Sequence, residues 1–233
     1  PINVAVFRAF RARALPPRHP DDATFAREIP RYLAAGLVRD QGEEGACTGF
    51  GLAAVVQYLF WQRGQLSAGA RLSARMLYHL ARFYDEWPGE KYDGSSCRGA
   101  LKGWHKHGVC TETLWPYDPA RFVPPSPGWD VDAVTRPLGV YYRIDRRSVV
   151  DMQAAIAETG AIYCSGSVHR GWDVKERRRV PRSHRDLPEI AVRDKVEGGH
   201  AFALVGYDER GFVVQNSWGP DWGAHGLAIL PYE

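Results

Sequence analysis

Long apolar runs in the first half of the chain and alternating apolar segments in the second half predict two different kinds of structure. The segment 47–64 is apolar on nearly every side from Phe50 to Trp61. It is too short to span a bilayer, so it predicts a helix buried in a protein core. Helical periodicity, serine N-caps and terminal glycines predict three further helices, at 73–87, about 97–107 and 148–159.

The second half of the chain is dominated by short apolar segments that are typical of strands. The segment Asp208-Glu209-Arg210-Gly211 predicts the turn of a hairpin that joins the second and third of these strands. The predicted strands cover 161–168, 200–207, 212–218 and 226–232. This order predicts an α+β protein with a helical N-terminal lobe, a strand-rich C-terminal lobe and a cleft between them, a common place for a site.

The predicted boundaries follow the same patterns. Residues 1–24 are rich in proline and arginine, which predicts an irregular segment. A single domain is expected over 25–233, with the helical lobe at about 40–140 and the β lobe at about 141–233. Six prolines between 114 and 139 predict a long connection within the first lobe.

Composition narrows the function. The 233 residues are 45% hydrophobic and carry a net charge of +3, which is too small to indicate nucleic-acid or membrane binding. No run of 18 apolar residues occurs, and the N-terminus lacks the layout of a secretory signal. Four cysteines are few for a secreted chain, so a reducing, cytoplasmic compartment is expected. The sequence gives no indication of oligomeric state.

The most strongly charged stretch is 170–195, which contains nine Lys or Arg residues and five acidic residues. The favoured interpretation is a solvated, mobile loop. The alternative is a loop over the cleft that favours acidic substrates.

One cluster of residues has the chemistry of an activated thiol. Cys47 lies where a polar, glycine-containing turn becomes the buried helix. The N-terminus of a helix offers free N–H groups and partial positive charge, and both favour the reactive thiolate. Gln41 lies six residues earlier, so its amide and the Cys47 N–H could donate to a developing oxyanion.

Two later clusters supply the groups that a thiol nucleophile needs. His200 follows two glycines at the start of an apolar strand, where its ring can face a cleft. Asn216 ends the next strand, and its side-chain oxygen could fix the tautomer and orientation of the imidazole. Trp218 could cover that hydrogen bond and exclude water from it.

These three clusters, QGxxGxCxGF, GHAxxxVGY and NSWGxxWGxxG, resemble the papain family of cysteine peptidases. The resemblance covers roughly residues 30–232 and is supported by His107-Gly108-Val109 and Leu114-Trp115-Pro116-Tyr117. It implies the two-lobed papain-like fold, with an antiparallel, barrel-like second lobe. It also implies Cys47 as nucleophile, His200 as base, Asn216 as its orienting partner and Gln41 in the oxyanion hole. The substrate-binding residues that it implies are Gly94, Ser95, Ser165, Gly199 and Trp218.

The chain departs from the family pattern near the nucleophile. Glu44 stands where the family has a disulfide-bonded cysteine, and its usual partner would fall near Tyr92. Thr48 replaces an aromatic residue, so packing behind the nucleophile must differ. A glycine pair that lines the family's substrate channel is reduced to Gly94-Ser95. These features are similar to a disulfide-poor, bacterial-type branch.

The resemblance implies hydrolysis of peptide bonds through a thioester, with a peptide or protein as substrate and no metal or cofactor. Acyl transfer to an amine by the same residues is one alternative, and a catalytically silent peptide-binding module is another. The set Cys97, His105, His107 and Cys110 could suggest zinc, but its spacing is not of the zinc type and a structural role is favoured. A disulfide between Cys97 and Cys110 is possible but not favoured.

Overall fold

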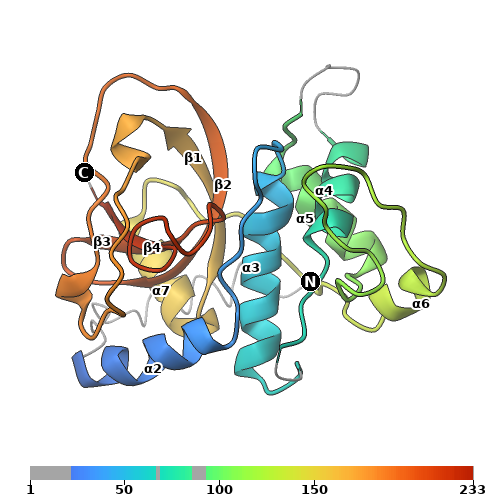
Figure 1. The fold of residues 1–233 in the computed structure, drawn as a ribbon, viewed down its shortest axis with the longest axis horizontal. Helices are drawn as coiled ribbons and strands as arrows, with labels where there is room; N and C mark the ends of the chain where they lie inside the picture. The colour runs from blue at the N-terminus through green and yellow to red at the C-terminus, as the bar shows by residue number, and fades with distance from the viewer. Residues whose placement is uncertain (1–21, 67–68, 86–92, 233) are drawn as a thin grey trace.

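The chain forms two lobes on either side of one central helix (Figure 1). The computed structural model describes residues 22–66, 69–85 and 93–232. The helical lobe contains α4 (Ala74–Phe83), α5 (Cys97–His107) and the short α6 (Trp129–Ala133). The central helix is α3 (Cys47–Gln62), and it separates these helices from the β lobe.

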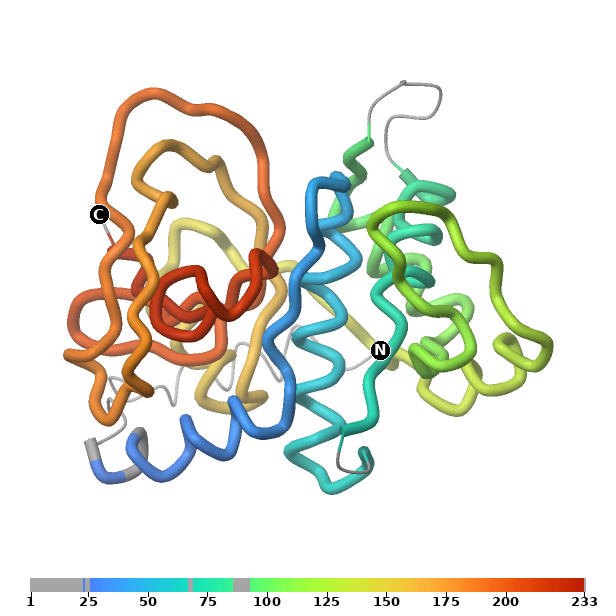
Figure 2. Tube along the Cα trace, in the orientation of Figure 1, coloured from blue at the N-terminus to red at the C-terminus, as the bar shows by residue number. Residues whose placement is uncertain are grey.

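The β lobe is built on one antiparallel sheet whose order follows the chain, β1-β2-β3-β4. The β lobe also holds α2 (Asp22–Ala34) and α7 (Val149–Thr159), as the trace in Figure 2 shows. The sheet among the described residues is open, so the barrel-like closure that the resemblance implied is not formed. Its strands are β1 (Ile162–Val168), β2 (Gly198–Tyr207), β3 (Gly211–Gln215) and β4 (Leu227–Pro231).

Two glycines allow α3 to approach both lobes closely. A Cβ atom built on Gly49 would lie 2.5 Å from the carbonyl oxygen of Ala74, at the start of α4. A Cβ atom on Gly51 would lie 2.9 Å from the backbone nitrogen of Phe202, in β2. Because no side chain intervenes, the backbone of α3 packs directly on α4 at one position and on β2 at the other. The N-terminal part of α3 is therefore fixed against β2, which begins with Gly198, Gly199 and His200.

Several local predictions are confirmed. The Ser73 hydroxyl accepts a hydrogen bond of 2.9 Å from the backbone of Met76, and the Ser148 hydroxyl accepts one of 3.2 Å from Asp151. These are N-caps of α4 and α7. Gly160 ends α7 with a φ of +91°, a conformation that glycine adopts without steric cost. None of the described helices is both long and apolar enough to cross a membrane.

Other boundaries were wrong for physical reasons. The predicted irregular segment 1–24 overlaps α2, which begins at Asp22, while residues 1–21 lie outside the described part. The proline- and arginine-rich composition predicted an irregular segment, but Ile29 and Tyr32 bury an apolar face of α2 against the β lobe. Tertiary burial outweighed the local signal.

Strand β3 also ends earlier than predicted, at Gln215 instead of 218. After Gln215 the side-chain oxygen of Asn216 accepts a 2.7 Å hydrogen bond from the backbone of Ser217. This local bond turns the chain out of the ladder. The predicted helix 73–87 likewise ends at Phe83, and residues 86 and 87 lie outside the described part.

The close approach of α3 to α4 predicts a specific sensitivity at Gly49. We expect Gly49→Ala to lower the free energy of unfolding by about 1–3 kcal/mol, because the new methyl group must displace backbone atoms. Gly139→Ala is the matched control, since a Cβ atom there meets nothing within 4 Å. Urea denaturation of both variants checks the prediction. Equal stabilities of the two variants would contradict it.

Candidate active site

Cys47 is the first residue of α3 and lies against the start of β2. The residue before it, Ala46, makes no side-chain cap, so the first N–H groups of α3 have no capping side chain beside the sulfur. Burial raises the pKa of the Cys47 thiol above its ordinary value of 9.0, while backbone hydrogen bonds from Ala201, Thr48 and Cys47 itself lower it. The hydrogen bond from Ala201 places the sulfur beside the residue that directly follows His200.

His200 is buried, with 6% of its surface exposed, and bonds to Asn216. Its Nε2 atom lies 2.7 Å from Oδ1 of Asn216. The same Oδ1 accepts a hydrogen bond from the backbone N–H of Ser217, which identifies this atom as the amide oxygen. Because an amide oxygen only accepts, the proton of a neutral His200 ring lies on Nε2. The Nδ1 atom then carries the lone pair that can take up a proton.

Aromatic side chains surround the His200 ring. The ring centroid of Trp218 lies 4.8 Å from that of His200, and those of Trp172 and Phe202 lie 5.9 and 6.0 Å away. Burial lowers the pKa of His200, and the hydrogen bond to Asn216 only partly offsets this effect. The aromatic cover therefore shields the His200–Asn216 hydrogen bond from water.

Gln41 is held by hydrogen bonds at both ends of its side chain. Its Oε1 atom accepts a 2.6 Å hydrogen bond from the Ser217 hydroxyl, and its Nε2 atom donates one of 2.9 Å to the carbonyl of Glu44. The backbone N–H of Gln41 also donates to the carbonyl of Ser217 at 2.8 Å. An amide nitrogen has two protons, so one N–H of Gln41 is not used by these contacts.

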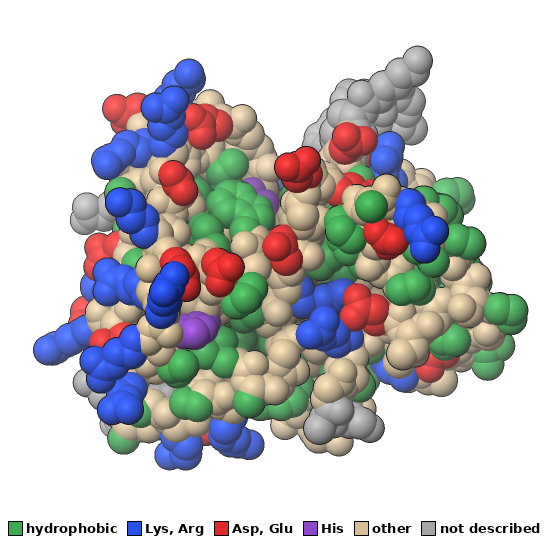
Figure 3. All heavy atoms as spheres, viewed as in Figure 1, with side chains coloured by type: hydrophobic (Ala, Val, Ile, Leu, Met, Phe, Trp, Pro, Cys, Tyr) green, Lys and Arg blue, Asp and Glu red, His purple; other side chains and the backbone are tan. Residues whose placement is uncertain are grey.

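The predicted substrate-binding residues occupy both sides of the first turn of α3. The Ser95 hydroxyl lies 2.6 Å from that of Thr48, and the residue before Gly94 packs against Gly45. On the β lobe, Ser165 and Gly199 are exposed, opposite Ala201 and Ser167 respectively. Figure 3 shows the surface hollowed between the two lobes, at the top of the view where α3 begins.

Polar contacts hold Thr48, which follows Cys47 and stands in place of the aromatic residue that the resemblance implied. Besides the contact of its hydroxyl with Ser95, its carbonyl accepts a 2.8 Å hydrogen bond from the Tyr163 hydroxyl. Two polar contacts, one from each lobe, hold this position.

Sequence reasoning missed two residues of the site. Ser217 was noted only within a motif, yet it bonds to both Gln41 and Asn216. Trp172 was counted only as part of the charged stretch, yet it is buried against His200. A single tryptophan among so many charged residues is itself a signal of a buried anchor, because large aromatic side chains rarely remain exposed.

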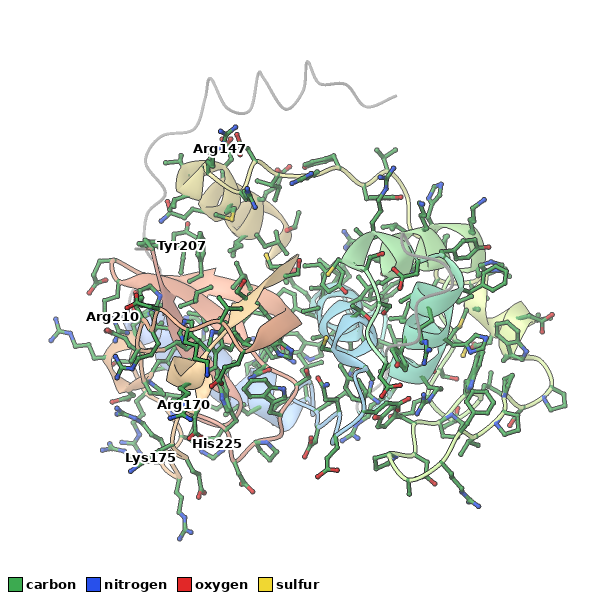
Figure 4. The ribbon with its side chains drawn as sticks, turned by 90° about the horizontal axis from the view of Figure 1, so that it is seen from above. Arg147, Arg170, Lys175, Tyr207, Arg210 and His225 are labelled. Carbon is green, nitrogen blue, oxygen red and sulfur yellow. The ribbon has the colours of Figure 1, made fainter. Side chains whose placement is uncertain are left out.

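The charged segment 170–195 lies on the β lobe. Trp172, Leu187 and Ile190 are buried there, whereas the side chains of Arg177, Arg178 and Arg179 are exposed, as expected for a solvated surface. Figure 4 shows Arg170 and Lys175 on the β lobe.

The four cysteines are free thiols. As for Cys47, burial is the largest effect on the other two thiols with a resolved shift, raising the pKa of Cys110 to about 11 and that of Cys164 to about 12. Within the described ranges, no group of three or more His, Cys, Asp or Glu side chains is placed to hold a metal ion.

Comparisons with known proteins show the family and the fold of this chain. Residues 26–231 match the model of a family described as "Papain family cysteine protease". An uncharacterised peptidase C1-like protein of Acanthamoeba polyphaga mimivirus is 29% identical over 83% of this chain. The chain spans 64% of that viral protein. Cathepsin B-like CP3 of Giardia intestinalis is 54% identical, but only over 14% of this chain and 12% of its own length.

Solved structures show the same fold. Xylellain, a cysteine protease from Xylella fastidiosa, is similar with a TM-score of 0.68 and 30% identity, over 84% of this chain and 76% of its own. Bromelain from Ananas comosus, solved in complex with the E64 inhibitor, gives a TM-score of 0.59 at 19% identity, over 87% of both chains. At that identity the second likeness concerns the fold alone.

The burial of Cys47 predicts how its reactivity depends on His200. In His200→Ala the thiol stays buried without an imidazole, so its raised pKa keeps it neutral to above pH 9.0. We expect its alkylation by iodoacetamide at pH 7 to fall at least about tenfold and to increase as pH rises through 9. Mass spectrometry of the Cys47 peptide measures this rate. A pH profile identical to that of the wild type would contradict the prediction.

Proposed function

The chain belongs to the papain family of cysteine proteases, and we propose that it hydrolyses peptide bonds with Cys47 as nucleophile and His200 as acid and base. The observation that carries this proposal is the state of the His200 ring. Asn216 fixes the ring proton on Nε2, so Nδ1 is the basic atom. The backbone N–H of Ala201, the residue that follows His200, donates a hydrogen bond to the sulfur of Cys47.

In this proposal the Cys47 thiol and the His200 imidazole become charged only together. Burial alone favours the neutral thiol and the neutral imidazole, since it raises the pKa of Cys47 and lowers that of His200. Transfer of the thiol proton to Nδ1 creates two opposite charges that stabilise each other where little water screens them. The N–H groups at the start of α3 further stabilise the thiolate. The pair therefore titrates as one coupled unit.

The reaction then follows in balanced steps. The thiolate forms a bond to the carbonyl carbon, and the carbonyl oxygen becomes an oxyanion that accepts hydrogen bonds from Gln41 and the Cys47 N–H. The carbon–nitrogen bond breaks as His200 gives its proton to the leaving amine, which leaves a thioester on Cys47. A water molecule attacks the thioester while His200 accepts its proton. The carboxylic acid leaves, and the thiolate–imidazolium pair is restored.

The substrate in this proposal is an extended peptide or protein segment. β1 is an edge strand, and its exposed residues Ser165, Gly166 and Ser167 lie opposite the start of β2. Such an edge offers backbone groups to a peptide that lies along the cleft. Gly94 and Ser95 provide the facing wall from the helical lobe, and Trp218 lies beside His200.

Digestion of a peptide library tests the proposal directly. We expect the wild type to cleave library peptides and Cys47→Ala to cleave none, because the thioester can no longer form. The epoxide E-64, which is bound to bromelain in a solved structure, should label Cys47 in the wild type. Cys164→Ala is the matched control, since a thiol with a pKa of about 12 contributes no nucleophile at neutral pH and its loss should leave labelling unchanged. Cleavage by Cys47→Ala at the wild-type rate would exclude the proposal.

The role of Gln41 can be separated from that of the nucleophile. We expect Gln41→Ala to lower kcat/KM about 100- to 1,000-fold, the usual effect of removing one oxyanion donor. Alkylation of Cys47 by iodoacetamide forms no oxyanion and should stay within about twofold of the wild type. A variant that loses both reactions in parallel would show that Gln41 acts on the thiol and not on the oxyanion.

A further inference from the structure

We propose that Glu44 is a positioning residue for the oxyanion hole, and that its partly buried ion pair with Arg75 holds the Gln41 amide in place. This inference rests on the proposed function, because it assumes that Cys47 attacks a carbonyl and that Gln41 donates to the resulting oxyanion. It concerns a residue that makes no contact with Cys47 or His200 among the interactions described above.

The backbone of Glu44 orients the Gln41 side chain directly. Its carbonyl oxygen accepts the 2.9 Å hydrogen bond from Nε2 of Gln41 and a 2.6 Å hydrogen bond from the backbone of Ala46. One proton of the Gln41 amide is therefore directed at Glu44, which fixes the direction of the other. A shift of the Glu44 carbonyl would rotate the amide and misdirect the proton offered to the oxyanion.

The carboxylate of Glu44 anchors this carbonyl to α4. Its two oxygens accept hydrogen bonds of 2.8 and 2.6 Å from the two terminal nitrogens of Arg75, a two-pronged geometry that allows little rotation. The Arg75 side chain is 5% exposed and that of Glu44 is 26% exposed. An ion pair with so little water around it is held more rigidly than a surface pair.

Tyr117 joins the two ends of the turn. Its hydroxyl donates to the backbone carbonyl of Gln41, and its ring lies 4.5 Å from the guanidinium carbon of Arg75. Tyr117 therefore binds the turn at Gln41, and Arg75 binds it at Glu44. The Tyr117 ring and the Arg75 guanidinium pack on each other. Burial raises the pKa of Glu44, but the hydrogen bonds and the charge of Arg75 outweigh it, so the pKa is lowered and the carboxylate is ionised at neutral pH.

A purely structural role is the alternative. Buried ion pairs add little net stability, because desolvation of both charges offsets their attraction. Stability alone therefore gives a weak reason for this pair, whereas a requirement for orientation gives a direct one. The two roles differ in which reaction of Cys47 they affect.

Two reactions of the same thiol provide the test. Acylation by an N-acyl amino acid p-nitrophenyl ester passes through an oxyanion, whereas alkylation by iodoacetamide does not. We expect Glu44→Gln and Tyr117→Phe each to slow acylation about tenfold or more through kcat, with alkylation within about twofold of the wild type. Asp132→Asn is the matched control, because it breaks a partly buried ion pair with Arg136 in the same lobe. It should change neither rate.

The outcomes separate the two hypotheses. Unchanged acylation in Glu44→Gln and Tyr117→Phe, or a parallel fall of both reactions, overturns the inference while leaving the proposed function intact. A wild-type Cys47 that reacts with neither reagent overturns the proposed function and this inference with it. If Glu44→Gln does not fold, as judged by its thermal unfolding, Tyr117→Phe decides alone, since it removes a contact to Gln41 without leaving a buried charge unpaired.

Discussion

The direct backbone packing of α3 on β2 is the constraint on which the site depends. Cys47 belongs to a helix that contacts both lobes, while His200 belongs to the β lobe alone. At Gly51 the helix touches the backbone of Phe202, and one turn earlier the N–H of Ala201 reaches the sulfur of Cys47. A side chain at Gly51 would move the helix away from the strand. Cys47 and His200 would then separate, although each would keep its own local structure.

Burial of the site makes its geometry specific. A buried polar group without a partner costs free energy, and hydrogen bonds tie the side-chain oxygens of Gln41 and Asn216 to particular neighbours. Ser217 makes hydrogen bonds to both Gln41 and Asn216. Its hydroxyl and carbonyl bind Gln41, and its N–H binds the same Asn216 oxygen that orients His200. The side chain proposed to receive the oxyanion and the side chain that orients His200 are therefore held by one residue.

An ion pair, and not a disulfide, connects the turn around Glu44 to the rest of the helical lobe. Its four cysteines are free, and Glu44 stands where the papain family has a disulfide-bonded cysteine. Glu44 instead forms a two-pronged ion pair with Arg75, which is packed on Tyr117. Unlike a disulfide, such a pair is unaffected by reducing conditions. It couples the turn that carries Gln41 and Glu44 to α4 without adding another sulfur near Cys47.

The sequence by itself determined the main elements and the residues of the three motifs. α3, α5, α7 and the cap of α4 follow from periodicity, serine caps and terminal glycines, which act over a few residues. The positions of Cys47, His200, Asn216 and Gln41 follow from motifs of the same short range. The tertiary structure decided the start of α2, the open sheet, and the roles of Ser217, Trp172 and Arg75. These depend on partners such as Gln41 and Ser217, which are 176 residues apart. No local pattern encodes such a contact, because burial and hydrogen bonding between distant segments exist only once the two lobes have packed.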